Sequence, residues 1–180
     1  MKRPPSGSDD DAYVRVTNPG RYAVLHSTAW LLVETLEANY LVDRIDGWVD
    51  PGPALRVDAV SAVRLVPAGG GAPIAITLTK FPGLAVRLGY WLTRFFPACG
   101  CDACDEKPDE LVGDLQRYVH AVVAGRFREE LRTRPLRGGS MHHELWGDDW
   151  LTSEEQTIDR QKARHLGAPA RVEWGPWPRR

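Results

Sequence analysis

Two long stretches of the chain repeat apolar residues at the spacing of an amphipathic helix. The first spans residues 17–42, with Asn18 placed to cap a helix and Pro19 at its first helical position. Its apolar residues recur every three or four positions: Tyr22, Leu25, Ala29, Leu32, Leu36 and Tyr40. The second spans residues 108–132, with an apolar stripe of Leu111, Leu115, Tyr118, Val119, Val122 and Val123. Each pattern predicts a helix with one buried face, and the first predicts about six turns.

The segment between these helices shows the two-residue alternation of β-strands. Residues 54–68, 73–80 and 84–92 are each rich in aliphatic residues, and the second places Ile74, Ile76 and Leu78 on one face. Three glycines at 69–71 separate the first two segments, and Pro82–Gly83 forms a turn before the third. Short connections of this kind predict three consecutive antiparallel strands.

The C-terminal third is less regular. Residues 140–146 and 170–174 predict short strands. Residues 152–167 contain two possible capping boxes, Thr152 with Glu155 or Ser153 with Gln156, and these predict a third helix. The order of elements indicates an α+β fold, in which an antiparallel sheet of four to five strands carries two to three helices, packed mainly on one face.

Length and composition limit the possibilities for organisation and location. A chain of 180 residues suits one domain over residues 13–180, and the polar residues 1–12 predict a disordered N-terminal tail. The net charge of −1 supplies no field for nucleic acid, so we expect no nucleic-acid partner. The longest apolar run, residues 22–33, is too short to span a bilayer, and the N-terminus lacks the apolar segment of a secretory signal. We therefore expect a cytoplasmic protein without a membrane partner.

All the cysteines lie in one short segment, FPACGCDACDE. Cys99, Cys101 and Cys104 form a C-x-C-x-x-C pattern, an odd and clustered set that does not suit a disulfide framework. The short spacing brings the sulfur atoms to a common centre, as in zinc sites with three cysteines and one further ligand. The pattern therefore predicts a zinc site.

The fourth ligand is not evident from the spacing. His120 lies too far along the second predicted helix, roughly 16 Å from its start, to reach the sulfur atoms. The remaining candidates are residues of a nearby strand or of the loop itself: His143, His142, Asp105 and Asp102.

Two alternatives remain open for the thiols. They could be inert, partly buried side chains in a loop with an acidic rim. A redox-active pair is the other alternative, but Asp102, Asp105 and Glu106 would raise the thiol pKa by like-charge repulsion. The acidic residues therefore disfavour a reactive thiolate and favour a bound cation.

Several segments together resemble a bacterial family known only as a domain of unknown function. They are the cysteine block, the helical segment TNPGRYAVLH, the strand pair ITLTKFPGLAVRLG, the segment VVAGRFREE and the closing EWGPWPRR. The resemblance extends from about Val14 through most of the chain. It implies a cytosolic single-domain protein and offers no catalytic residue or cofactor to transfer.

A second constellation points to a zinc deaminase. His142 and Glu144 form H-x-E, which such enzymes combine with P-C-x-x-C. Here the cysteines come first in the chain and Ala98 separates Pro97 from Cys99, so the match is poor.

The C-terminal tail carries two tryptophans among prolines. Trp174 and Trp177 would be costly in water, so we expect the tail to fold back onto the domain, with binding of a protein partner as the lesser alternative.

Our preferred interpretation is a non-enzymatic protein with a structural zinc ion at the cysteines. One alternative is a metal-dependent hydrolase or deaminase with Glu144 or Asp105 as general base. The other is a protein-interaction module that uses Trp174 and Trp177 of the tail.

Overall fold

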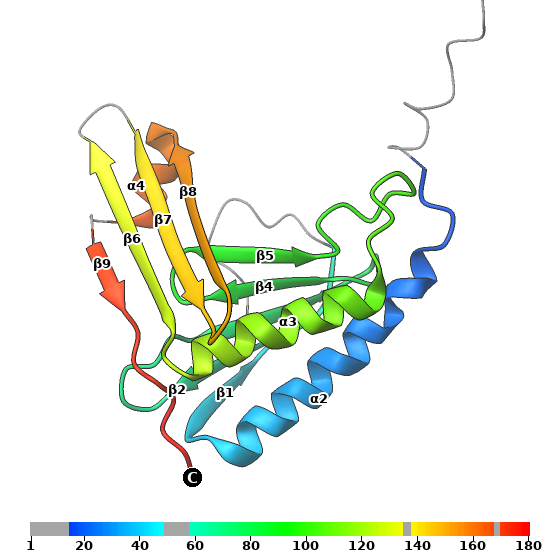
Figure 1. The fold of residues 1–180 in the computed structure, drawn as a ribbon, viewed down its shortest axis with the longest axis horizontal. Helices are drawn as coiled ribbons and strands as arrows, with labels where there is room; N and C mark the ends of the chain where they lie inside the picture. Colours follow the sequence, from blue (N-terminus) through cyan, green and yellow to red (C-terminus); the bar gives the residue numbers. More distant parts are fainter. Residues whose placement is uncertain (1–14, 49–57, 135–137, 168–169) are drawn as a thin grey trace, which may run out of the picture.

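Two long helices lie side by side on one face of an antiparallel sheet (Figure 1). They are α2 (Val24–Asn39), preceded by a 3₁₀ turn η1 (Pro19–Ala23), and α3 (Pro108–Val123). The computed structural model describes residues 15–48, 58–134, 138–167 and 170–180. Asn18 does occupy the position before Pro19, but its side chain makes no capping hydrogen bond.

The first sheet has five strands in sequence order, and every neighbouring pair is antiparallel. The strands are β1 (Val42–Asp46), β2 (Ala59–Pro67), β3 (Ile74–Thr79), β4 (Leu84–Leu88) and β5 (Leu92–Phe96). The predicted three-stranded antiparallel arrangement is confirmed by β2, β3 and β4. Their inward residues, such as Leu65, Ile76 and Val86, join Leu25 and Leu115 of the helices in the main core.

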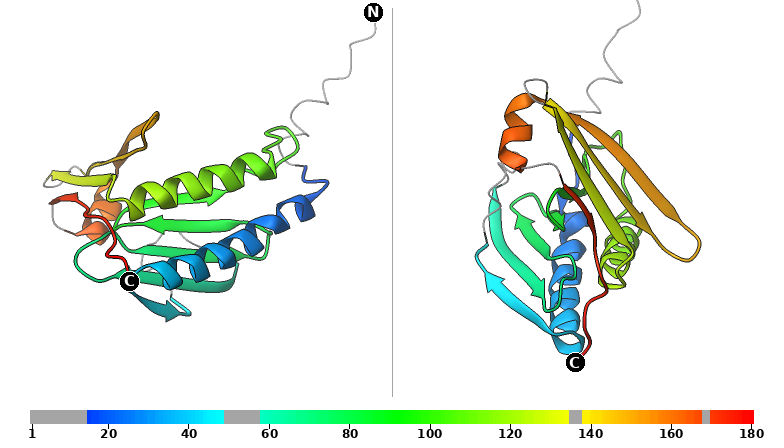
Figure 2. Two further views of the ribbon diagram at one scale, coloured as in Figure 1. Left: turned by 60° about the horizontal axis from the view of Figure 1, so that its bottom comes forward. Right: turned by 90° about the vertical axis from the view of Figure 1, so that its left-hand side faces the viewer.

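A second antiparallel sheet lies beyond the C-terminal end of α3 (Figure 2). Its strand order is β8 (Leu151–Ile158), β7 (Gly138–Trp146), β6 (Phe127–Arg134) and β9 (Ala170–Glu173). The short helix α4 (Arg160–Leu166) packs on this sheet, where Leu131, Met141, Ile158 and Ala163 form a second core. The α+β class is confirmed, with the strands divided between two sheets instead of one.

Two of the predicted helices are partly wrong, since each contains a helix of the structure, α3 or α4, but also residues that form a strand. The second helix ends at Val123, and residues 127–132 belong to β6. Gly125 adopts a φ of 72°, which favours glycine and ends the helix. Residues 152–158, predicted as the start of a helix, form most of β8, because this segment pairs along its whole length with β7.

The boundaries of other elements also differ from the prediction. The strand predicted over residues 84–92 ends at Leu88 as β4; the chain then reverses at Gly89, with a φ of 64°, and β5 begins at Leu92. Strand β1 was not predicted, because its sequence VDRID is mostly polar and its burial is slight. The predicted disordered tail at 1–12 lies outside the described residues.

The C-terminal tail folds back onto the main core, as predicted. Trp174 is 8% exposed and Trp177 is 3% exposed. The indole nitrogen of Trp177 donates a hydrogen bond to the carbonyl oxygen of Ala72 at 2.9 Å. In the part of the chain that the structure describes, no helix combines the length and apolar character needed to cross a membrane.

Candidate metal-binding site

The three thiols lie in the loop between β5 and α3, at the opposite end of α3 from the second sheet (Figure 1). Their sulfur atoms all lie within 4.8 Å of one another, and those of Cys99 and Cys101 are 3.1 Å apart. Cys101 is buried, whereas Cys99 and Cys104 are exposed, and all three are free thiols. The predicted convergence of the cysteines on one point is therefore present.

The spacing of the sulfur atoms fits a single metal ion. Zinc–sulfur bonds of about 2.3 Å at tetrahedral angles place the sulfur atoms about 3.8 Å apart. The distance between the sulfur atoms of Cys99 and Cys101, 3.1 Å, is somewhat shorter than that value, and none of the three distances exceeds 4.8 Å. The three sulfur atoms are therefore close enough together to hold one metal ion.

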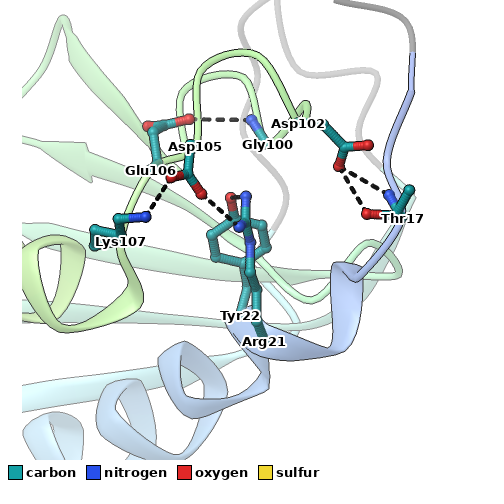
Figure 3. A network of polar contacts seen from close by, with 8 residues as sticks. All are labelled: Thr17, Arg21, Tyr22, Gly100, Asp102, Asp105, Glu106 and Lys107. Carbon is teal, nitrogen blue, oxygen red and sulfur yellow. Dashed lines mark hydrogen bonds and ion pairs between the residues drawn. The ribbon is translucent and has the colours of Figure 1, made fainter. Parts of the chain in front are cut away.

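The loop is closed by the side chain of Glu106. Its carboxylate accepts hydrogen bonds from the backbone N–H groups of Ala98, Cys99 and Gly100, at 2.9, 3.0 and 3.0 Å. Figure 3 shows the hydrogen bond from Gly100. Burial by itself would raise the pKa of Glu106, but these three donors outweigh it and the pKa is lowered. Glu106 is therefore an anion that fixes the backbone around Cys99.

The loop is also tied to the segment before α2. Asp102 accepts hydrogen bonds from the backbone N–H and the hydroxyl group of Thr17, at 2.9 and 3.1 Å (Figure 3). Asp105 forms ion pairs with Arg21, at 2.9 Å, and with Lys107. Hydrogen bonds to Lys107 and Arg21 lower the pKa of Asp105. Each acidic side chain of the loop therefore already has hydrogen-bonding or ion-pairing partners within the protein.

This pairing corrects the expected effect of the acidic rim on the thiols. The pKa of Cys101 is lowered, first by a hydrogen bond from Cys99 and then by backbone N–H groups that include that of Cys104. The pKa of Cys104 is raised to about 12, first by its hydrogen bond with Cys101 and then by that with Cys99. The thiols thus shift one another's pKa values, whereas the carboxylates have other partners.

The candidate fourth ligands are placed as follows. His142 and His143 are on β7 of the second sheet, where His142 lies 3.1 Å from the hydroxyl oxygen of Ser153 and His143 lies 3.4 Å from a carboxylate oxygen of Glu154. Asp105 is beside the thiols in sequence but engages Arg21 and Lys107. Among the described residues, the group of potential ligands at this loop consists of the three sulfur atoms alone. The assignment of His142, His143 or Asp105 as a ligand stays a prediction.

Glu144, considered above as a general base, also belongs to the second sheet. It pairs with Arg128 at 2.5 Å and lies 3.5 Å from His142. Figures 1 and 2 place β7 far from the cysteine loop, near the other end of α3. The structure thus does not bring the H-x-E residues and the cysteines together.

Two carboxylates that organise the structure, Glu106 and Glu129, were not among the predicted site residues. Glu106 follows the last cysteine closely, but nothing in the sequence distinguishes it from its acidic neighbours. Glu129 was assigned to a helix, yet it is 1% exposed in β6. The burial of Glu129 in a strand could have been predicted from the sequence. Phe127, Glu129 and Leu131 alternate with charged residues, as on the buried face of a half-buried strand.

The family of the chain follows from a comparison with known families. Residues 3–180 match a family of unknown function (DUF6226). The chain belongs to this family. Comparisons with curated proteins and with solved structures gave no match. Membership of DUF6226 confirms the resemblance to a family of unknown function and extends it to almost the whole chain, including the cysteine loop.

Proposed function

We propose that the loop between β5 and α3 binds one zinc ion through the thiolates of Cys99, Cys101 and Cys104. The observation that carries the proposal is the convergence of three sulfur atoms within 4.8 Å in a loop whose backbone is held by other residues. Thiolates are soft ligands and select zinc over magnesium or calcium. The role of the ion is structural: it links the three cysteines to one another and stabilises the loop.

The pKa values of the thiols are consistent with the binding of a cation to the loop. Without a metal, the hydrogen bonds among the thiols raise the pKa of Cys104 to about 12, so the three cannot all ionise near neutral pH. A divalent ion offsets the repulsion between thiolates and releases their protons on binding. Cys101, whose pKa is lowered, is the thiol best prepared to bind first.

The hydrogen bonds of the loop fix the backbone that carries the three cysteines. Glu106 holds the backbone N–H groups of residues 98–100, and Asp102 and Asp105 attach the loop to Thr17 and Arg21. Since these contacts fix the backbone of the loop through groups of the protein, binding requires rearrangement of side chains more than of backbone. We therefore expect zinc to rigidify this loop and its contacts with the segment before α2.

The first test is the metal content of the purified full chain, measured by elemental analysis. The expected result is one zinc ion per chain, lost on substitution of Cys101 by serine. Cobalt substitution should give the thiolate-to-metal absorption of a sulfur-rich tetrahedral site. Protein that holds no metal after purification, and takes up neither zinc nor cobalt under reducing conditions, would overturn the proposal.

Two variants compare the contribution of a sulfur ligand to zinc affinity with that of a predicted fourth ligand. Cys104→Ser should weaken zinc binding by at least about tenfold, because a hydroxyl group is a much poorer zinc ligand than a thiolate. His143→Gln serves as the matched control in the second sheet and should leave zinc affinity unchanged. Equal losses from the two substitutions would instead support His143 as a ligand. Hydrogen exchange of the loop amides, with and without zinc, tests the structural role.

The other two predicted functions gain no such support. A hydrolase or deaminase would need a general base beside the metal. Of the two candidates, Glu144 belongs to the second sheet, and Asp105 forms ion pairs with Arg21 and Lys107. A partner for Trp174 and Trp177 could reach these side chains only after the tail is released, because both are buried. Both functions stay predictions.

A further inference from the structure

Two of the three thiols in the cysteine loop are nearly in contact. The sulfur atoms of Cys99 and Cys101 lie 3.1 Å apart, and Gly100 alone separates the two residues. A separation of about 3–3.5 Å is typical of two atoms that are placed to react with each other. A disulfide also requires Cα atoms about 4.4–6.8 Å apart, and two steps along an extended chain span at most about 7 Å. The positions of Cys99 and Cys101 therefore suit a disulfide bond.

The backbone between these two cysteines is bent and fixed. Gly100 adopts a φ of 79°, which residues with a side chain rarely adopt. A Cβ atom at this position would also lie 2.7 Å from the ring of Phe81, so both the backbone conformation and the packing favour glycine. Glu106 accepts the N–H groups of Cys99 and Gly100, the second of which is drawn in Figure 3. The approach of the two sulfur atoms is therefore a property of the folded loop.

The two cysteines differ in their access to solvent. Cys99 is exposed, whereas Cys101 is only 3% exposed. A dissolved oxidant therefore meets Cys99 first, and the sulfur atom of Cys101 is close enough to react with the product. Cys104 is also exposed, and its sulfur atom lies within 4.8 Å of the other two. It is the competing partner that an experiment must distinguish.

We propose that Cys99 and Cys101 form a redox pair that hydrogen peroxide converts to a disulfide. The sulfur of Cys99 first attacks the peroxide: an S–O bond forms, the O–O bond breaks, one water leaves, and Cys99 becomes a sulfenic acid. The sulfur of Cys101 then attacks that of Cys99: the S–S bond forms, the S–O bond breaks, and a second water leaves. The two thiols supply the two electrons and two protons that reduce one peroxide molecule to two of water.

The reaction regulates the metal site, and this consequence rests on the zinc binding proposed above. Zinc is bound by thiolates, and the sulfur atoms of a disulfide carry no negative charge to bind it. Oxidation of Cys99 and Cys101 leaves Cys104 as the single sulfur ligand. The loop therefore holds zinc under reducing conditions and releases it in the presence of peroxide. A dithiol reductant restores the pair by thiol–disulfide exchange.

The first experiment treats the full chain, freed of metal by a chelator, with a small excess of hydrogen peroxide. The intact mass should fall by two hydrogen atoms, and dithiothreitol should reverse the change. Remaining thiols are blocked with iodoacetamide before reduction, and the thiols released by reduction are labelled with N-ethylmaleimide. Cys104 should carry the first label, and Cys99 and Cys101 the second. A disulfide that includes Cys104, or oxidation to sulfinic acid without a disulfide, would overturn the proposal.

Two variants of the metal-free chain compare the competing pairs. Cys104→Ser keeps Cys99 and Cys101 and should form the disulfide within about twofold of the wild-type rate. Cys99→Ser leaves Cys101 and Cys104 and should form a disulfide at least about tenfold more slowly, because this pair lacks the contact at 3.1 Å between Cys99 and Cys101. Equal rates for the two variants contradict the assignment of the pair. Thermal unfolding of each variant checks that it is folded.

The second experiment adds peroxide to the zinc-loaded full chain and follows the released metal with a chromogenic chelator. One zinc ion should be released for each disulfide formed, and reduction should restore zinc binding. A chain that carries the disulfide and still retains zinc would contradict the regulatory role. If the reduced chain takes up no zinc, the function proposed above fails. The disulfide mapped in the metal-free chain then still decides whether Cys99 and Cys101 are a redox pair.

Discussion

Two glutamates of this protein each accept three N–H hydrogen bonds, yet their pKa values shift in opposite directions. Glu106 binds three backbone N–H groups of the cysteine loop, and its pKa is lowered. Glu129 binds the backbone N–H groups of Tyr90 and Trp91 and the indole N–H of Trp174, at 2.7, 2.9 and 3.0 Å. Its pKa is nevertheless raised to about 7.

Burial accounts for the difference. Glu106 is half-buried in a loop, so its hydrogen bonds exceed the cost of removing the charge from water. Glu129 is 1% exposed between the two sheets, and there the loss of hydration is the largest cause of the shift. Equal numbers of donors thus stabilise the carboxylate in one place and fail to compensate for its burial in the other.

Asp105 extends the comparison to an exposed carboxylate. It pairs with Arg21 and Lys107, and its side chain is 53% exposed. Water competes with such ion pairs and salt screens them, so their contribution to folding is small. The three carboxylates form a series in which the expected effect of substitution falls as exposure rises.

The largest effect is expected for Glu129→Ala. The substitution leaves three N–H donors without a partner inside the protein, and each unsatisfied buried donor is costly. We expect the free energy of unfolding to fall by about 3–5 kcal/mol, measured by urea denaturation. The control is Glu130→Ala, the adjacent residue on the open face of β6, which should cost less than about 1 kcal/mol. Similar losses for the two variants would contradict the special role of Glu129.

The next effect is a dependence of stability on pH. The folded pKa of Glu129 is raised from 4.5 to about 7, so its stabilising contribution is complete below about 4.5 and is lost as the pH rises through about 7. The full change corresponds to about 3 kcal/mol. Urea denaturation of the wild type between these pH values should show the loss, whereas Glu129→Gln should lack it.

The difference between wild type and Glu129→Gln isolates this group from other titrations. His143 pairs with Glu129 across β6 and β7, and burial lowers its pKa, which gives a pH dependence of opposite sign. Because His143 is present in both proteins, its contribution largely cancels. A difference that stays constant with pH would show that Glu129 does not titrate in this range.

An intermediate effect is expected for Glu106→Ala. Loss of the carboxylate frees the N–H groups of Ala98, Cys99 and Gly100, so their hydrogen exchange should accelerate, with a local cost of about 1–2 kcal/mol. If the loop binds zinc, its affinity should fall about 10–100-fold, as for other residues that orient metal ligands. Glu110→Ala, on the exposed first turn of α3, is the matched control. Unchanged exchange at all three amides would exclude the closing role of Glu106.

The smallest effect is expected for Asp105→Asn. Asparagine tolerates the positive φ of 43° at this position, so the substitution removes mainly the ion pairs with Arg21 and Lys107. The loss of unfolding free energy should be below about 1 kcal/mol. It should shrink further at about 1 M salt, where the Debye length is about 3 Å. A larger loss that persists in salt would place Asp105 with the buried carboxylates.

Much of the fold was predictable where local pattern and tertiary environment agree. Helix α2 and most of α3 follow from their apolar stripes, and β2 and β3 follow from two-residue alternation. The segments 127–132 and 152–158 were wrongly predicted as helical, since FREELR contains good helix formers and TSEEQ resembles a capping box. Strand formation there depends on pairing with β7, and such pairing is not visible in local sequence.

The cysteine loop and the first sheet likewise differ in how much of their side-chain arrangement the sequence could predict. The convergence of the three thiols was predictable because only one or two residues separate neighbouring cysteines of a C-x-C-x-x-C segment, which keeps them within reach of one another. The placement of Arg64 and Arg87 on one face of the first sheet was not predictable, because it is the register of β2, β3 and β4 that brings them there.

The sequence by itself determined the elements and contacts that depend on nearby residues: the two long helices, the first three predicted strands and the proximity of the cysteines. Tertiary structure alone decided which charged groups lose their water. Glu106 and Glu129 carry the same side chain, and only the packing of two sheets and a tail around Glu129 reverses its pKa shift. The physical reason is that desolvation is set by neighbours distant in sequence, whereas helical periodicity and short tethers act along the chain.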